Sequence, residues 1–191
     1  LVALEDPRLK DIASTVAAGD DLWPDENARG AILRMFPRDL SVEQLCQALG
    51  WMKEKKRSAG ALSLRLPRLI ENAELDPPRF EALRDGLVNL ISDGLRWQKG
   101  RHIISDRSHL SGVLAATCVR GLAVRKSDDW FHASVLALRL HHREYRKDEM
   151  HKALQQRLAG LDAEENARLF WVADSLMQSL HIISDPRKRL W

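Results

Sequence analysis

Residues 76–91 read DPPRFEALRDGLVNLI, and this stretch decides the fold class. Asp76 followed by Pro77 is a typical helix start, because an N-cap residue stands before a proline at the first helical position. Apolar side chains then recur at spacings of three and four, which places them on one face of an α-helix. These side chains are Phe80, Leu83, Leu87, Leu90, Ile91 and Leu95. The stretch predicts a long amphipathic helix that ends near Gly100.

Helix start and stop signals of the same kind recur along the whole chain. Ser41-Val42-Glu43-Gln44 forms a capping box, in which the first and fourth residues satisfy each other's backbone N–H groups. We expect the other helices to begin near Asp6, Pro24, Ala61, Asp106, Ser127 or Asp128, Asp148 and Asp162. Gly19, Pro37 and Gly160 are expected to end helices, and Pro67 to interrupt the weaker element after Ala61. No stretch alternates with period two, so an all-α fold of about nine helices is predicted.

A five-residue motif occurs twice in the chain. His102-Ile103-Ile104-Ser105-Asp106 recurs as His181-Ile182-Ile183-Ser184-Asp185, 79 residues later. Either two helix corners have converged by chance, or the interval holds two helix pairs of about 40 residues each, which is the HEAT/armadillo period. We therefore predict an α-solenoid of HEAT/armadillo-like antiparallel helix pairs, with a compact helical bundle as the alternative. Residues 1–191 are interpreted as a single module, with a possible sub-boundary at the polar loop 53–60.

Composition is typical of a globular chain and gives little sign of a dedicated nucleic-acid binder. Hydrophobic residues make up 45% and charged residues 30%, while the net charge is only +3. Cys46 and Cys118 stand alone, as expected in a reducing compartment. No apolar run approaches the roughly 20 residues that span a bilayer, so a cytoplasmic location without membrane contact is predicted. The start at Leu1 and the helix signal shortly before Trp191 are interpreted as those of a fragment of a larger protein.

Two stretches of the chain resemble a region of known proteins. The first, residues 27–45, reads NARGAILRMFPRDLSVEQL; the second contains Leu64-Arg65-Leu66-Pro67 and then DPPRFEAL at residues 76–83. They resemble the helical region downstream of the ATPase module in bacterial NACHT-type (STAND) NTPases. The resemblance implies a helical array that senses a ligand or packs against the NTPase core, often in antiviral defence. The ATPase residues themselves are not carried over, because the sequence has no G-x-x-x-x-G-K-[ST] loop.

No residue pattern in the sequence predicts catalysis. Cys118 occupies an apolar helix position, which suits a buried structural thiol better than a nucleophile. No G-x-S-x-G elbow is present. The carboxylates of Asp76, Asp106, Asp162 and Asp185 stand where helix caps belong. We therefore predict no enzyme activity, no catalytic residue and no cofactor.

The segment RLHHRE at residues 139–144 is the most reactive-looking part of the sequence. His141 and Glu144 could share a helix face and bind a metal ion together with His151. However, the neighbouring arginine and lysine side chains would repel a cation, and positive side chains stabilise a helix C-terminus. A solvated helix end is therefore preferred over a metal site.

The same basic run is the predicted interaction site. Its members are Arg139, His142, Arg143, Arg146 and Lys147. They could meet an acidic protein surface or phosphates, although interleaved acidic residues are typical of a solvated face. The expected partners are other domains of the parent chain and a protein ligand, with nucleic acid second and no membrane.

Five of the tryptophans are assigned from their positions along the predicted helices. Trp97, Trp130 and Trp171 lie within apolar stripes and are predicted to be core, whereas Trp23 and Trp51 lie near corners where one could be exposed for binding. The sequence as a whole predicts a non-catalytic helical-repeat module of a NACHT-like NTPase that offers a ligand-sensing or scaffold surface. The alternative is a helical nucleic-acid-binding subunit.

Overall fold

The computed structural model describes residues 8–19, 25–54, 62–93, 108–124, 127–140 and 147–172. All regular structure within these ranges is helical, which confirms the predicted all-α fold class. The helices are α1 (Leu9–Ala18), α2 (Asp25–Met35), α3 (Val42–Glu54), α4 (Leu62–Asn72), α5 (Pro77–Asp93), α6 (Ser108–Val124), α7 (Asp128–Leu140) and α8 (Lys147–Leu158), and residues 163–172 form a further helix.

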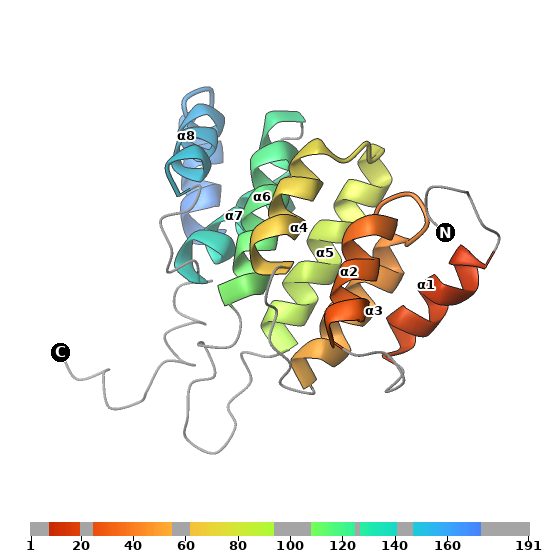
Figure 1. Ribbon diagram of the computed structural model, residues 1–191. Coiled ribbons are helices and arrows are strands. Elements are labelled where there is room, and N and C mark those ends of the chain that lie inside the picture. Colours follow the sequence, from red (N-terminus) through yellow and green to blue (C-terminus); the bar gives the residue numbers. More distant parts are fainter. Residues whose placement is uncertain are drawn as a thin grey trace, which may run out of the picture.

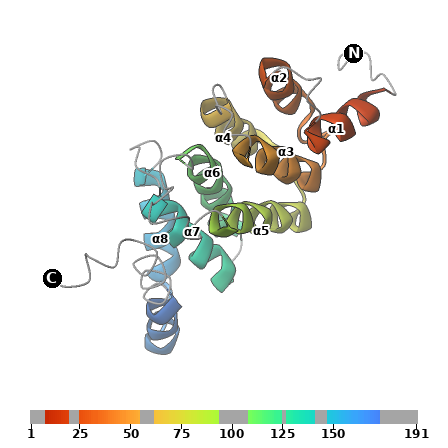
Figure 2. The ribbon, with the colours of Figure 1, turned by 90° about the horizontal axis from the view of Figure 1, so that it is seen from below.

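The helices pack in two rows, in which each helix contacts the next but one along the chain. Helices α1, α3, α5 and α7 follow one another in the first row, and α2, α4, α6 and α8 in the second. Contacts between α1 and α2, α5 and α6, and α7 and α8 join the rows. Helices α1 and α8 consequently lie at opposite ends of the molecule (Figure 1), and the two rows run side by side (Figure 2).

Three of the predicted helix starts are made by the expected side chains. At the start of α3, the Gln44 backbone N–H donates to Ser41 Oγ (3.2 Å) and the Ser41 N–H donates to Gln44 Oε1 (2.9 Å), which is the predicted capping box. Asp76 Oδ1 accepts the Arg79 N–H at the start of α5 (2.9 Å). Asp162 Oδ1 likewise accepts the N–H of Glu165 (2.8 Å). These carboxylates serve as caps, as the sequence indicates.

Three predicted boundaries are wrong. Helix α4 runs through Pro67 without interruption, because its apolar face, which includes Leu66, is buried in the core and tertiary packing outweighs the lost backbone hydrogen bond. Lys53 and Glu54 still belong to α3, so the polar loop predicted at 53–60 begins later, and the rest of it lies outside the described residues. Asp148 lies inside the first turn of α8 rather than before it.

Helix α1 ends on a glycine that a neighbouring tryptophan covers. Gly19 adopts φ 72° and ψ 37°, the left-handed conformation that glycine adopts without steric cost. The indole ring of Trp51, on α3, lies so close to Gly19 that a Cβ atom there would overlap it. Trp51 Nε1 also donates to the carbonyl oxygen of Val16 (3.0 Å). The predicted end of this helix is confirmed, and it fixes α1 against α3.

Two arginines and two aromatic rings form a stack that ties three helices together. The guanidinium of Arg120 on α6 lies 4.8 Å from the centroid of the Phe80 ring on α5. The centroid of the Phe80 ring in turn lies 6.0 Å from that of Trp130 on α7. The guanidinium of Arg84 on α5 covers the Trp130 ring, 4.8 Å from its centroid. Cations placed over aromatic faces inside a protein contribute more than at its surface, since little water competes for them.

The two copies of the repeated motif, residues 102–106 and 181–185, lie outside the described part of the chain. Among the described helices, none combines the length and the apolar character that a membrane crossing requires.

Candidate functional site

Two members of the predicted basic run, Arg139 and Lys147, lie at facing ends of α7 and α8 along the chain, and these two helices contact each other. Arg139 is the penultimate residue of α7, and Lys147 is the first residue of α8. His142, Arg143 and Arg146 lie outside the described residues, as do His141 and Glu144 of the candidate metal site. His151 is exposed on α8. In the described ranges, no group of three or more His, Cys, Asp or Glu side chains is placed to hold a metal ion.

A larger candidate site lies beside α8. A half-open cavity of about 620 Å³ lies between α6, α8 and the helix at residues 163–172. Its apolar lining comes from Val119, Leu122, Ala123, Ala153 and Leu161. The volume lies within the ~300–1,000 Å³ typical of ligand sites. Sequence periodicity did not indicate this cavity, because its walls come from helices separated along the chain.

Charges of both signs surround the cavity. Glu149 and Lys152 come from α8, while Glu165 and Arg168 come from the following helix. Arg168 Nη2 also forms an ion pair with Asp128 Oδ1 (3.2 Å), which links this helix to the start of α7. A mixed rim around an apolar floor is the arrangement of a polar-rimmed protein contact, whereas a phosphate site would need an excess of positive charge.

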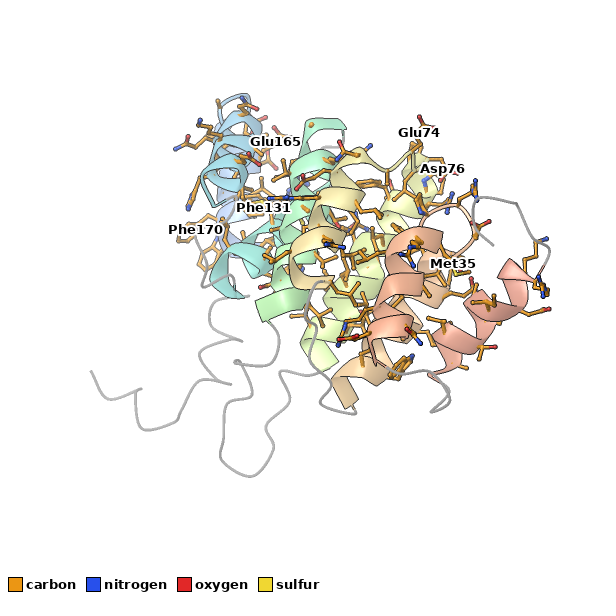
Figure 3. The ribbon with its side chains drawn as sticks, viewed as in Figure 1. Met35, Glu74, Asp76, Phe131, Glu165 and Phe170 are labelled. Atoms are coloured by element: carbon orange, nitrogen blue, oxygen red, sulfur yellow. The ribbon has the colours of Figure 1, made fainter. Side chains whose placement is uncertain are left out.

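An exposed pair of aromatic side chains lies on the same terminal helix. Phe170 is 63% and Trp171 is 64% exposed, and their rings meet edge to face with centroids 5.8 Å apart. Figure 3 shows Phe170 at the left edge of the molecule, on the same helix as Glu165. Exposed aromatic residues are enriched in protein interfaces because they bury a large area at low entropic cost.

The predicted roles of the tryptophans need correction. Trp130 is 1% exposed and belongs to the core, as predicted. Trp51 is 9% exposed, so it is not the one of the two corner tryptophans that could be exposed for binding. Trp171 was predicted to be core and is exposed. Leu169 is buried and Val172 half-buried on the same helix, and consecutive helical residues are about 100° apart, so Trp171 must point away from them. Trp23 and Trp97 lie outside the described residues.

The two thiols are held in their protonated form. Cys118 is fully buried on α6, and burial raises its pKa to about 12, although a hydrogen bond with Ser134 and the charge of Arg84 act in the opposite direction. Burial also raises the pKa of Cys46 to about 12, with a smaller contribution from the charge of Glu43. A thiolate is the reactive form of cysteine, so both side chains serve in packing.

The structure thus brings together an apolar cavity, a mixed-charge rim and exposed aromatic rings at the end of the helix rows. Comparison with protein-family models, with curated proteins and with solved structures finds no match to this chain.

Proposed function

We propose that this chain is an α-solenoid module whose function is to bind another protein surface. The observation that carries the proposal is the contact pattern of the two rows, in which α1 packs on α3, α3 on α5 and α5 on α7, while α2, α4, α6 and α8 follow the same rule. Stacked helix pairs that contact mainly their neighbours are the defining feature of helical-repeat proteins. The apolar cavity with its charged rim and the exposed pair Phe170–Trp171 supply a surface suited to protein contact.

A compact bundle differs from a solenoid in its cooperativity, and this difference can be measured. In a solenoid, terminal pairs open before central ones, because each pair is stabilised only by its neighbours. Native-state hydrogen exchange on the whole chain should therefore show the slowest amides in α6, which contacts α4, α5, α7 and α8, and faster exchange in α1. Equal protection of α1 and α6, both rising to the global free energy of unfolding, would indicate a bundle instead.

We further propose that the module belongs to a cytoplasmic NACHT-like NTPase, in which it senses a ligand or packs against the ATPase core, and that it acts in antiviral defence. The resemblance over residues 27–45 and 76–83 supports this assignment. In the structure the first stretch forms a helix, a corner with buried Phe36 and Leu40, and a capped second helix. Cys46 and Cys118 are both free, as expected in a reducing compartment.

The reading frame around this segment tests the family assignment. A G-x-x-x-x-G-K-[ST] loop is expected upstream, whose backbone N–H groups would cradle the nucleotide phosphates. Its absence from the complete reading frame would overturn the assignment. By calorimetry, the present chain should show no saturable ATP binding at micromolar concentration. If it binds ATP, the module is not the non-catalytic surface proposed here.

A further inference from the structure

A second concave surface lies between α2 and α4, at the far end of the molecule from the cavity beside α8. Gly30, Leu33 and Arg34 of α2 and Arg65 and Leu69 of α4 line a groove of about 290 Å³. This volume lies at the lower limit of small-molecule sites, which measure ~300–1,000 Å³. The groove is therefore of a size for one or two protruding side chains.

Gly30 makes this groove hollow, and nothing within the fold requires a glycine at that position. A Cβ atom at Gly30 would meet only Nη1 of Arg34, at 3.9 Å, which is an ordinary contact with the end of a flexible side chain. Its φ is not in the positive range that favours glycine. A glycine inside a helix costs up to about 1 kcal/mol relative to alanine. Close approach of a partner to the backbone of α2 would explain why this cost is tolerated.

The charges beside the groove are of one sign. Arg34 and Arg65 are both exposed, and neither forms an ion pair with another described residue. This distinguishes them from Arg84 and Arg168, whose guanidinium groups are paired with carboxylates. The floor between the two arginines is formed by the half-buried side chains of Leu33 and Leu69.

We propose that the α2–α4 groove, formed by Gly30, Leu33, Arg34, Arg65 and Leu69, binds a short acidic segment of a partner protein. An aliphatic side chain of the segment would pack on the two leucines above Gly30, and flanking carboxylates would pair with the two arginines, which bind carboxylates in bidentate geometry. This inference rests on the proposed function as a protein-binding module and names the chemistry of one partner.

The lining favours a peptide over a nucleic acid. Single-stranded nucleic acids are bound on aromatic side chains over which the bases stack, and none of the five lining residues is aromatic. Two arginines beside a small apolar floor match one side chain and its neighbouring carboxylates better than an extended phosphate backbone. Nucleic-acid binding is therefore an outcome of the test that would overturn the proposal.

The test uses the whole chain and a defined pool of probes. The pool contains fluorescein-labelled heptapeptides with a central Leu or Ile and Asp or Glu at two variable positions, and binding is followed by fluorescence anisotropy at about 0.1 M salt. Saturable binding is expected, with a loss of affinity when the acids are replaced by amides, or when salt screens them. A labelled oligonucleotide is the competing probe.

Two variants and a charge-matched control separate the groove from the general charge of the protein. Arg34→Glu with Arg65→Glu should weaken peptide binding at least about tenfold, as for close charge pairs at interfaces. Arg8→Glu with Lys10→Glu makes the same change in charge on exposed positions at the start of α1, and affinity should change less than about twofold. Gly30→Ala should weaken binding although it raises the melting temperature, an outcome that a purely structural glycine would not give.

Several results would overturn the proposal. The first two are equal losses in the groove variant and the α1 control, and unchanged affinity in Gly30→Ala. The others are preference for the oligonucleotide, or no saturable binding of the pool up to about millimolar concentration, the weak end of the affinity range. The proposed function fails separately, on the hydrogen-exchange gradient. A uniform exchange pattern together with groove-dependent peptide binding would reject the solenoid and keep the site.

Discussion

Arg84 lies over the indole ring of Trp130, with its guanidinium carbon 4.8 Å from the ring centroid, although Arg84 is only 6% exposed. The guanidinium is also paired with Asp85 (2.7 Å) and lies 3.8 Å from a carboxylate oxygen of Asp129. A buried cation needs such partners, since its desolvation would otherwise be very costly. This contact joins α5 to α7 in the first row of helices.

Replacing Arg84 by Met should destabilise the fold. The methionine would keep most of the apolar stem but lose the cation over Trp130 and leave the carboxylate of Asp85 unpaired. We expect the free energy of unfolding to fall by about 1–2 kcal/mol, the range of a desolvated cation–π contact. Urea denaturation would measure it. An unchanged midpoint would mean that packing alone holds these helices together.

The Arg120 side chain should stabilise the end of a helix in the neighbouring pair. Its Nη1 donates from α6 to the carbonyl oxygens of Ile70 (2.7 Å), in the last turn of α4, and Ala73 (2.6 Å), which directly follows that helix. Each carbonyl also accepts one backbone N–H, from Ala73 and from Leu75 respectively, so Arg120 adds a charged donor at the helix end, where few intrahelical partners remain. Arg120→Ala should cost about 1.5–3 kcal/mol, as for hydrogen bonds to a charged group. Lys10→Ala on exposed α1 is the control and should change stability by less than about 0.5 kcal/mol.

Gly121 is a position where even a methyl group should not be tolerated. A Cβ atom there would overlap the ring of Trp130, which is 1% exposed and cannot move aside. Gly121→Ala should cost about 1–3 kcal/mol through overpacking. Gly30→Ala is the matched control and should stabilise the protein by up to about 1 kcal/mol, because its Cβ meets only the end of the Arg34 side chain, at an ordinary contact distance of 3.9 Å. Thermal unfolding of both variants gives the comparison, and a gain in stability at position 121 would contradict the close packing of α6 on α7.

The buried thiols predict a loss of stability at alkaline pH. Burial raises the pKa of Cys46 and Cys118 from an ordinary value of 9.0 to about 12. Their contribution is therefore fully present below pH 9.0 and is lost as the pH rises toward 12, because the unfolded thiols ionise first. Each thiol should lower the free energy of unfolding by about 1 kcal/mol at about pH 10 relative to about pH 8.

The variant Cys118→Ala isolates this effect. It loses some packing at every pH, so the relevant quantity is the difference in its free energy of unfolding between about pH 8 and pH 10, compared with the same difference in the parent protein. The drop should be smaller by about 1 kcal/mol in the variant. Equal drops would show that other groups account for the alkaline sensitivity.

Features that depend on neighbours along the chain were predictable from the sequence. The all-α class follows from apolar spacings of three and four, and the caps at Ser41, Asp76 and Asp162 follow from residues only three positions apart. The left-handed end of α1 at Gly19 is equally local. The exposure of Trp171 could also have been predicted, because the stripe through Leu169 and Val172 leaves Trp171 on another face of the helix. The prediction assigned Trp171 to that apolar stripe instead.

Only the tertiary structure decided which helices meet and what lies between them. Arg120 caps carbonyls that lie 47 and 50 residues before it in the chain, and Trp51 covers a glycine on another helix. The cavity beside α8 likewise needs α6, which α7 separates from α8 along the chain, and the groove is walled by α2 and α4, which are separated by α3. Sequence periodicity fixes the apolar face of a helix, because backbone geometry repeats locally. It does not fix the partner of that face, since hydrophobic burial is non-directional and many pairings would bury a similar area.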